Sequence, residues 1–190
     1  MNTSYPTEAE LADAIESAAR MAINDLFAQH PGHYFYYVSL ITSGEAHPPV
    51  LTAWSKEALE DAVKDEVDKE DARWGLEWSY GESPFFCFGE PYFQEVKDLF
   101  ARRPDMNSLM WDESAWNAEC ELRLHAMEAA MSRLNEEGLF GTGQDRFNVV
   151  VNVEVMPPDY TNTQRAKRLN PPEAIRTWLA EVAEREDGDV

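Results

Sequence analysis

Residues 34–41 read YFYYVSLI, and this stretch decides the fold. It is aromatic or aliphatic at both alternating sets of positions, with Ser39 as the polar exception. A strand that is apolar on both faces is usually central in its sheet, because both faces must be covered. The turn-like residues 42–45 and two prolines follow, after which residues 50–54 (VLTAW) predict a second strand, antiparallel to the first.

A third strand is predicted near the carboxyl end, at residues 149–156. There the valines at odd positions alternate with Asn152 and Glu154, which is the period of a strand. Together these segments predict an α+β fold: a mainly antiparallel sheet of three or more strands with helices packed on one face.

Helical spacing dominates the rest of the chain. Thr7 and Glu10 form a capping box that predicts a helix start. The expected helices cover residues 8–29, 56–71, 91–103 and 112–137, with a last one after Pro171. Alternation in residues 73–80 predicts an extended segment over the core. We expect residues 157–170 to be a linker-like loop before the carboxyl-terminal helix, within one globular domain, 1–190.

The apolar stripes also predict which side chains form the core. The expected core residues are Tyr36, Val38, Leu40, Phe93, Val96, Leu124, Met127 and Val151.

The charge balance limits the partners. With 16 Lys and Arg against 36 Asp and Glu, the formal net charge is −20. Such a field repels phosphate backbones, so we expect no nucleic acid partner, and it favours encounter with a basic protein. The amino terminus lacks a signal-peptide pattern and no run is long enough to span a membrane. Two separated cysteines fit a reducing, cytoplasmic location.

Catalytic and cofactor motifs are missing from the sequence. The glycines 138, 141 and 143 follow a predicted helix and precede a strand, the reverse of a phosphate loop. The four histidines show no metal-ligand spacing. We therefore expect no cofactor, no metal and no catalytic residue.

Two functional hypotheses remain. The first is a non-catalytic protein-binding domain that contacts a basic partner through the acidic face of the second helix. Its candidate contact residues are Glu60, Asp61, Asp65, Glu66 and Asp68. The second is a small enzyme or ligand-binding domain that uses the aromatic segment 74–88, with a pocket at Trp74, Glu77 and Trp78. We also expect Arg73 or Glu77 to form an ion pair or a backbone hydrogen bond that anchors its segment.

Three stretches carry a family resemblance: YYVSLITSGE (36–45), RWGLEW (73–78) and PYFQEV (91–96). Together they resemble an uncharacterised bacterial family known as a domain of unknown function, over residues 10–155. Proteins of this family are similar in style to the immunity and adaptor proteins encoded near bacterial toxin genes. The resemblance implies a shared fold and, by association, a binding role rather than catalysis.

Overall fold

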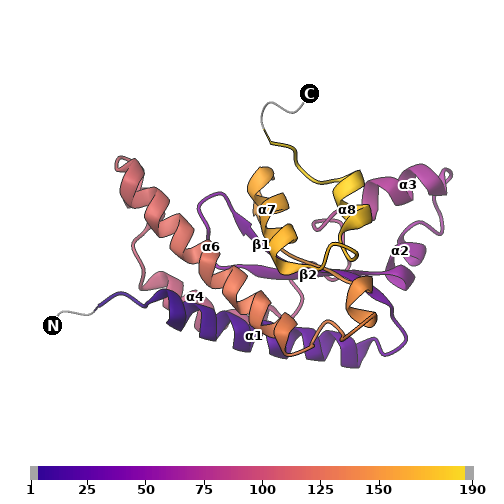
Figure 1. Cartoon of the computed structure of the whole chain (residues 1–190), viewed down its shortest axis with the longest axis horizontal. Helices are drawn as coiled ribbons and strands as arrows, with labels where there is room; N and C mark the ends of the chain where they lie inside the picture. The colour runs from indigo at the N-terminus through magenta and orange to yellow at the C-terminus, as the bar shows by residue number, and fades with distance from the viewer. Residues whose placement is uncertain (1–3, 187–190) are drawn as a thin grey trace.

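The computed structural model describes residues 4–186; residues 1–3 and 187–190 lie outside the described part. A three-stranded sheet is surrounded by helices (Figure 1). The main elements are α1 (Glu8–Gln29), β1 (Phe35–Ser43), β2 (Val50–Ser55), α2 (Lys56–Ala62), α3 (Lys69–Leu76), α4 (Gln94–Ala101), α6 (Glu113–Glu136), β3 (Val150–Met156), α7 (Tyr160–Leu169) and α8 (Arg176–Glu181). Short turns of helix form η1 (Glu90–Phe93), α5 (Met106–Leu109) and η2 (Asp145–Asn148).

The sheet is mixed, which corrects the expectation of a mainly antiparallel sheet. Its order is β2-β1-β3, so β1 is central as predicted. β1 pairs with β2 antiparallel and with β3 parallel. β2 ends beside the start of β1, and the long helical connection then carries the chain to the other side of β1, where β3 runs parallel to it.

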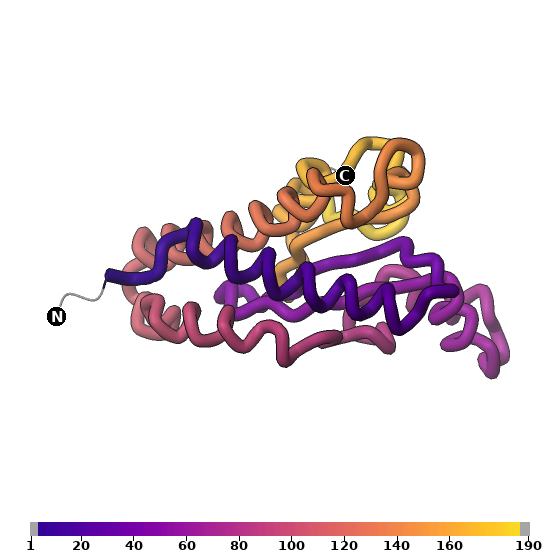
Figure 2. The backbone as a smooth tube through the Cα atoms, turned by 90° about the horizontal axis from the view of Figure 1, so that it is seen from below, coloured from indigo at the N-terminus to yellow at the C-terminus, as the bar shows by residue number. Residues whose placement is uncertain are grey.

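Both faces of the sheet are covered. Every residue of β1 except Ser43 is buried, as is every residue of β3 except Met156. In Figures 1 and 2 the long helix α1 lies across one side of the strands, and α8 lies on the other. Of the predicted core residues, Leu124 is half-buried and the other seven are buried, so the stripes located the core correctly.

The predicted helix over residues 56–71 is broken in two. α2 ends at Ala62, and Asp68 caps α3 by accepting a hydrogen bond from the backbone N–H of Asp71. As a result, residues 73–76 are helical rather than extended, which corrects the alternation-based prediction. Residues four apart, such as Trp74 and Trp78, lie on the same face of a helix and also on the same face of a strand. The spacing of these tryptophans therefore fits a helix as well as the extended segment that was predicted.

The predicted loop at 157–170 is also wrong, because most of it is helix α7. Asp159 accepts a hydrogen bond from the Thr161 N–H and so caps this helix. α7 runs beside the outer edge of β3, and two of its side chains, together with that of the capping residue Asn170, bond that edge. Prolines on both sides and few apolar residues gave this helix the composition of a loop.

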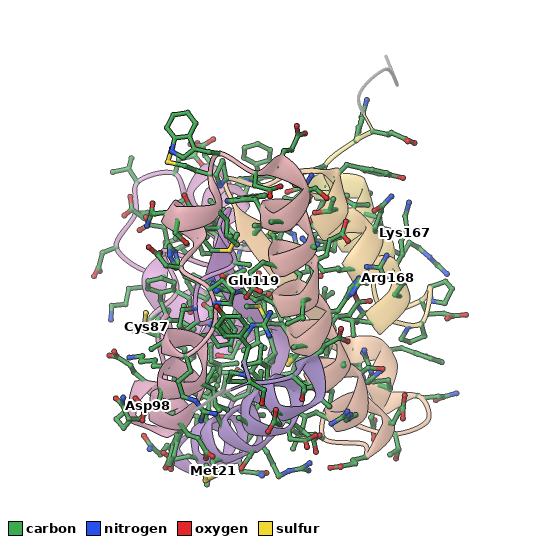
Figure 3. All side chains as sticks on the ribbon, turned by 90° about the vertical axis from the view of Figure 1, so that its left-hand side faces the viewer. Met21, Cys87, Asp98, Glu119, Lys167 and Arg168 are labelled. Atoms are coloured by element: carbon green, nitrogen blue, oxygen red, sulfur yellow. The ribbon has the colours of Figure 1, made fainter. Side chains whose placement is uncertain are left out.

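A buried ion cluster joins α6 to the end of α4. Glu119 pairs with both Arg103 and Arg123, and all three side chains are at most 10% exposed. Figure 3 shows Glu119 inside the molecule, whereas Met21 and Asp98 lie at its periphery. Arg103 lies just beyond the end of α4 and reaches across to α6.

Candidate functional site

One face of the sheet is polar although it is buried. Ser39 pairs in register with Thr52 on β2 and with Asn152 on β3, so the three side chains share a face. Glu154 follows Asn152 by two residues and joins them on that face. The amide nitrogen of Asn152 has no hydrogen-bond partner among the described residues. Buried polar groups without partners are uncommon, which makes this face a candidate site.

The segment after α3 covers this polar face through its backbone carbonyls. Thr52 donates a hydrogen bond to the carbonyl of Tyr80 at 2.9 Å, and the Trp54 indole donates one to the carbonyl of Ser79 at 2.7 Å. This segment is therefore fixed to the sheet by polar side chains rather than by a further strand.

A register shift at the start of β1 brings two adjacent tyrosines to the same tryptophan. The ladder with β2 skips Tyr36, which is an irregularity of the β-bulge kind. The rings of Tyr36 and Tyr37 lie 5.4 Å and 6.1 Å from the Trp78 ring, both edge-on. Tyr36 also donates a hydrogen bond to the carbonyl of Glu77, which fixes Trp78 over the strand.

Glu154 is the central polar residue of this region. It is 7% exposed, and its Oε1 accepts hydrogen bonds from Tyr37 at 2.5 Å and Ser39 at 3.2 Å. No hydrogen bond to its second oxygen, Oε2, is present among the described residues, although the Asn152 side chain also acts on the carboxylate. Burial raises the pKa of Glu154 to about 7, although the side chains of Tyr37, Ser39 and Asn152 act to lower it. Burial and the Glu154 charge raise the pKa of Tyr37 well above its ordinary value, so Tyr37 remains a donor.

Glu154 lines a cleft of about 320 Å³, which we call the Glu154 cleft. Carboxylates reach it from separate places: Glu154 from β3, Glu181 from α8 and Glu184 from the segment beyond. No Lys, Arg or His is among the described lining residues. The aromatic lining residues are Trp74, Trp78, Tyr80 and Trp178. An aromatic and acidic lining favours a positively charged ligand.

Specific hydrogen bonds hold the carboxyl-terminal wall of the cleft. Glu181 accepts a hydrogen bond from the Trp78 indole at 2.7 Å, which joins α8 to the segment after α3. Thr163 on α7 donates one to the carbonyl of Glu184 at 2.9 Å. The wall is thus tied to two other parts of the fold.

The five acidic residues predicted to contact a partner are all exposed, but three have structural contacts. Glu60 forms an ion pair with Arg73, Asp61 forms one with Lys64, and Asp68 caps α3. Asp65 and Glu66 lie in the turn between α2 and α3 and have no recorded ion pair among the described residues. We call residues 60–68 the acidic segment.

The predicted aromatic pocket is partly assembled. Trp74 and Trp78 both line the Glu154 cleft, but Glu77 is not among its lining residues. Burial and the nearby Glu181 raise the pKa of Glu77. The expected anchoring contact exists, because Arg73 pairs with Glu60 at 2.6 Å.

Sequence reasoning missed Glu154 itself, along with Trp178 and Glu181. A signal was present, because Glu154 alternates with valines in a predicted strand. A strand that pairs with a largely apolar central strand is itself buried on both faces. A carboxylate in that position must be either paired or functional.

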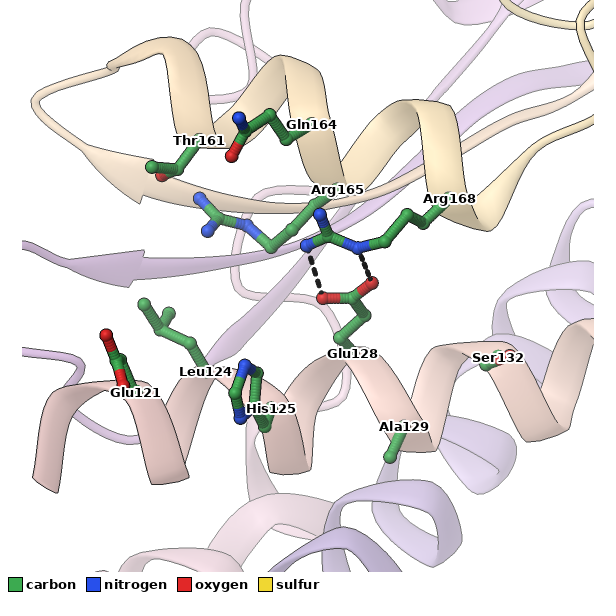
Figure 4. Close-up of a pocket in the computed structure, with 10 residues that line it drawn as sticks. All are labelled: Glu121, Leu124, His125, Glu128, Ala129, Ser132, Thr161, Gln164, Arg165 and Arg168. Carbon is green, nitrogen blue, oxygen red and sulfur yellow. Dashed lines mark hydrogen bonds and ion pairs between the residues drawn. The ribbon is translucent and has the colours of Figure 1, made fainter. Parts of the chain in front are cut away.

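A larger groove lies between α6 and α7 (Figure 4), with a volume of about 690 Å³. Both of its arginines are bound within the fold, one to a glutamate and one to the backbone. Arg168 forms two hydrogen bonds with Glu128, at 2.5 and 2.8 Å, and Arg165 donates to the carbonyl of Val153. These contacts join the two helices, so the groove is a weaker candidate than the Glu154 cleft.

Two further features are missing from residues 4–186. No group of His, Cys, Asp or Glu side chains there could hold a metal ion. None of the helices in that range combines the length and the apolar character needed to cross a membrane.

Comparison with known proteins identifies the family but no activity. A family model described as a domain of unknown function (DUF4303) matches residues 15–171, so the chain belongs to this family. No curated protein and no solved structure matches the chain. The family match ends before α8, so Trp178, Glu181 and Glu184 of the cleft lie outside it.

Proposed function

We propose that this chain is a non-catalytic binding protein for a basic protein partner, of the immunity or adaptor type. The observation that carries the proposal is the Glu154 cleft, where, among residues 4–186, three carboxylates and four aromatic rings meet without a basic lining residue. The acidic segment adjoins the cleft through α3, which contributes Trp74 to the lining. A net charge of −20 would accelerate encounter with a positively charged partner.

Affinity capture tests this proposal. The tagged protein is incubated with an extract of its source organism, the captured protein is purified, and association is measured at several salt concentrations. We expect a basic partner whose association rate falls steeply as salt rises. An acidic partner, or an association rate that does not depend on salt, would contradict the proposal.

A small enzyme is the second candidate, and one observation favours it. A carboxyl group with a pKa near 7 suits general acid–base chemistry at neutral pH. The described cleft lining contains no cysteine, histidine or lysine to act beside Glu154. This alternative predicts turnover of a small substrate that is abolished by Glu154→Gln, whereas the binding proposal predicts loss of complex formation without turnover.

A further inference from the structure

The two oxygens of the Glu154 carboxylate differ in their contacts. Tyr37 and Ser39 both donate to Oε1, which fixes the plane of the carboxylate against β1. No hydrogen bond to Oε2 is present among the described residues, although the Asn152 side chain lies close enough to lower the pKa of Glu154; the Glu154 side chain is more than nine-tenths buried and lines the cleft. A carboxylate oxygen that faces a cleft and has no hydrogen bond within the fold can accept one from a ligand.

We propose that the Glu154 cleft binds the guanidinium group of an arginine side chain presented by a protein partner. This inference rests on the proposed function, because it names the group of the basic partner that the cleft recognises. Glu154 accepts N–H donors through Oε2, and the tryptophan rings contact the faces of the guanidinium plane.

Guanidinium matches this lining better than other organic cations. It is planar, it is weakly hydrated for a cation, and it stacks on aromatic rings while its edges donate hydrogen bonds to carboxylates. An ammonium group is more strongly hydrated and has no flat face to stack. A trimethylammonium group would suit the aromatic rings but has no N–H for Oε2.

The size and charge of the cleft favour a peptide-bonded arginine over the free amino acid. At about 320 Å³ the cleft is at the small end of ligand pockets, which span roughly 300–1,000 Å³. Glu181 and Glu184 line the same cleft and would repel the α-carboxylate of free arginine. In a peptide that carboxylate is replaced by a neutral amide, so the repulsion is absent.

Binding should strengthen as the pH rises from 6 to 8, because Glu154 must lose its proton to hold a cation. The groups that face it are Tyr37 on β1, Tyr80 after α3, and Glu181 and Glu184 at the carboxyl end. Arg165 on α7 also interacts with its charge. Tyr37 and Tyr80 have raised pKa values because of burial, so they stay neutral in this range. Glu154, with a pKa of about 7, changes its charge in this range.

The test uses N-acetyl-arginine methylamide as the probe and follows tryptophan fluorescence, with calorimetry as a second readout. Matched probes are the neutral citrulline analogue, the lysine analogue and free arginine. The variants are Glu154→Gln, which keeps the shape of the side chain, and Trp74→Ala, at a ring that is 72% exposed and therefore dispensable for folding. The control variant is Glu82→Gln, the same chemical change at an exposed residue outside the cleft.

We expect saturable binding of the arginine probe, no binding of the citrulline probe, and weaker binding of the lysine analogue and of free arginine. Glu154→Gln should weaken binding about tenfold or more, which is typical for loss of a charge-assisted hydrogen bond. Trp74→Ala should weaken it roughly threefold to tenfold. Equal binding of the citrulline probe, unchanged affinity in both variants, or tighter binding of the lysine analogue would overturn the assignment. If free arginine binds more tightly than the capped probe, a free small molecule replaces the protein partner as the source of the guanidinium.

Failure of this inference and failure of the proposed function give different results. A basic partner that binds wild type and Glu154→Gln equally would leave the proposed function intact and remove the cleft from it. If the arginine probe binds the cleft but the captured partner is acidic, the cleft keeps its guanidinium specificity and the proposed function is wrong.

Discussion

Two buried glutamates in this protein sit in opposite environments. Glu119 is bonded by Arg103 and Arg123, and these bonds outweigh the effect of burial, so its pKa is lowered. Glu154 is contacted by the neutral side chains of Tyr37, Ser39 and Asn152, so burial dominates and its pKa is raised. The first carboxylate is compensated by two arginines inside the fold, and the second has no ion pair among the described residues. That contrast separates a structural acid from a candidate functional one.

The raised pKa of Glu154 predicts a specific pH dependence of stability. Its folded-state value of about 7 lies above its ordinary value of 4.5, so the native protein holds a proton that the unfolded chain releases. The stabilisation from this group is complete below pH 4.5 and is lost as the pH rises through 7. At about 1.4 kcal/mol per pKa unit, the loss is roughly 3 kcal/mol.

Urea denaturation of wild type and Glu154→Gln between pH 4.5 and 8 measures this effect. The difference in unfolding free energy between the two proteins should move by that amount in favour of the variant as the pH rises. Glu82→Gln should run parallel to wild type. A constant difference between wild type and Glu154→Gln would show that the carboxyl has an ordinary pKa.

At neutral pH, removing the charge of Glu119 should lower the free energy of unfolding more than removing that of the half-exposed ion pair between Glu128 and Arg168. Glu119→Gln leaves two arginines with little exposure without a counter-charge, and breaking a buried pair in this way costs about 3–5 kcal/mol. The matched control is Glu128→Gln, whose partner Arg168 is 54% exposed, so its cost should stay below about 1 kcal/mol. Chemical denaturation at pH 7 checks both, and equal losses in the two variants would contradict the buried-cluster interpretation.

At the scale of elements, α7 replaces a missing strand. The outward-facing backbone groups of β3 belong to Val151, Val153 and Val155, and side chains of Asn170, Arg165 and Asn162 bond them in that order. An open strand edge invites pairing with other chains, and covering it with a helix prevents this. Each asparagine donates to and accepts from the same strand residue, as a neighbouring strand would.

Asn170→Ala tests this role of the helix. The substitution leaves the N–H and C=O of Val151 buried without partners, which should cost about 2–4 kcal/mol. Asn148→Ala, at an exposed position just before β3, should change stability by less than about 0.5 kcal/mol. Thermal and urea denaturation give the costs, and light scattering should detect association of Asn170→Ala through the uncovered edge. A variant as stable and monodisperse as the control would refute the role.

Sequence patterns predicted the apolar elements well and the polar ones poorly. The strand at 34–41 and the helix after Thr7 were correct because burial fixes the spacing of their apolar residues. α7 was missed because its structural contacts are made by Asn and Arg, which in a sequence resemble loop residues. The cleft was found only in part for the same reason: Trp74 and Trp78 were recognised, but Glu154 acquires its meaning from burial by distant segments.

At the scale of the whole molecule, the acidic segment and the Glu154 cleft lie in the same region. Figure 1 shows α2, α3 and α8 at one end of the molecule and α4 near the other. Electrostatic steering of a partner by this charge is strongest at low salt, because the screening length falls to about 8 Å at physiological salt. The acidic segment would therefore act on the approach of a partner more than on the completed complex.

Once a basic partner has been identified, charge reversal at the acidic segment tests whether this segment acts on the approach of the partner rather than on the completed complex. We choose Asp65→Lys with Glu66→Lys, because Glu60 and Asp61 already form ion pairs and their reversal would also disturb α2 and α3. The control reverses Glu95 and Asp98 on α4, which changes the net charge equally at the distant end. Stopped-flow kinetics at low salt should show the first variant associating about fivefold more slowly, with a smaller change in the dissociation rate. The control variant should slow association less. At high salt the association rates of wild type and both double variants should become equal. Equal slowing by both double variants would mean that net charge, and not the acidic segment, guides the partner.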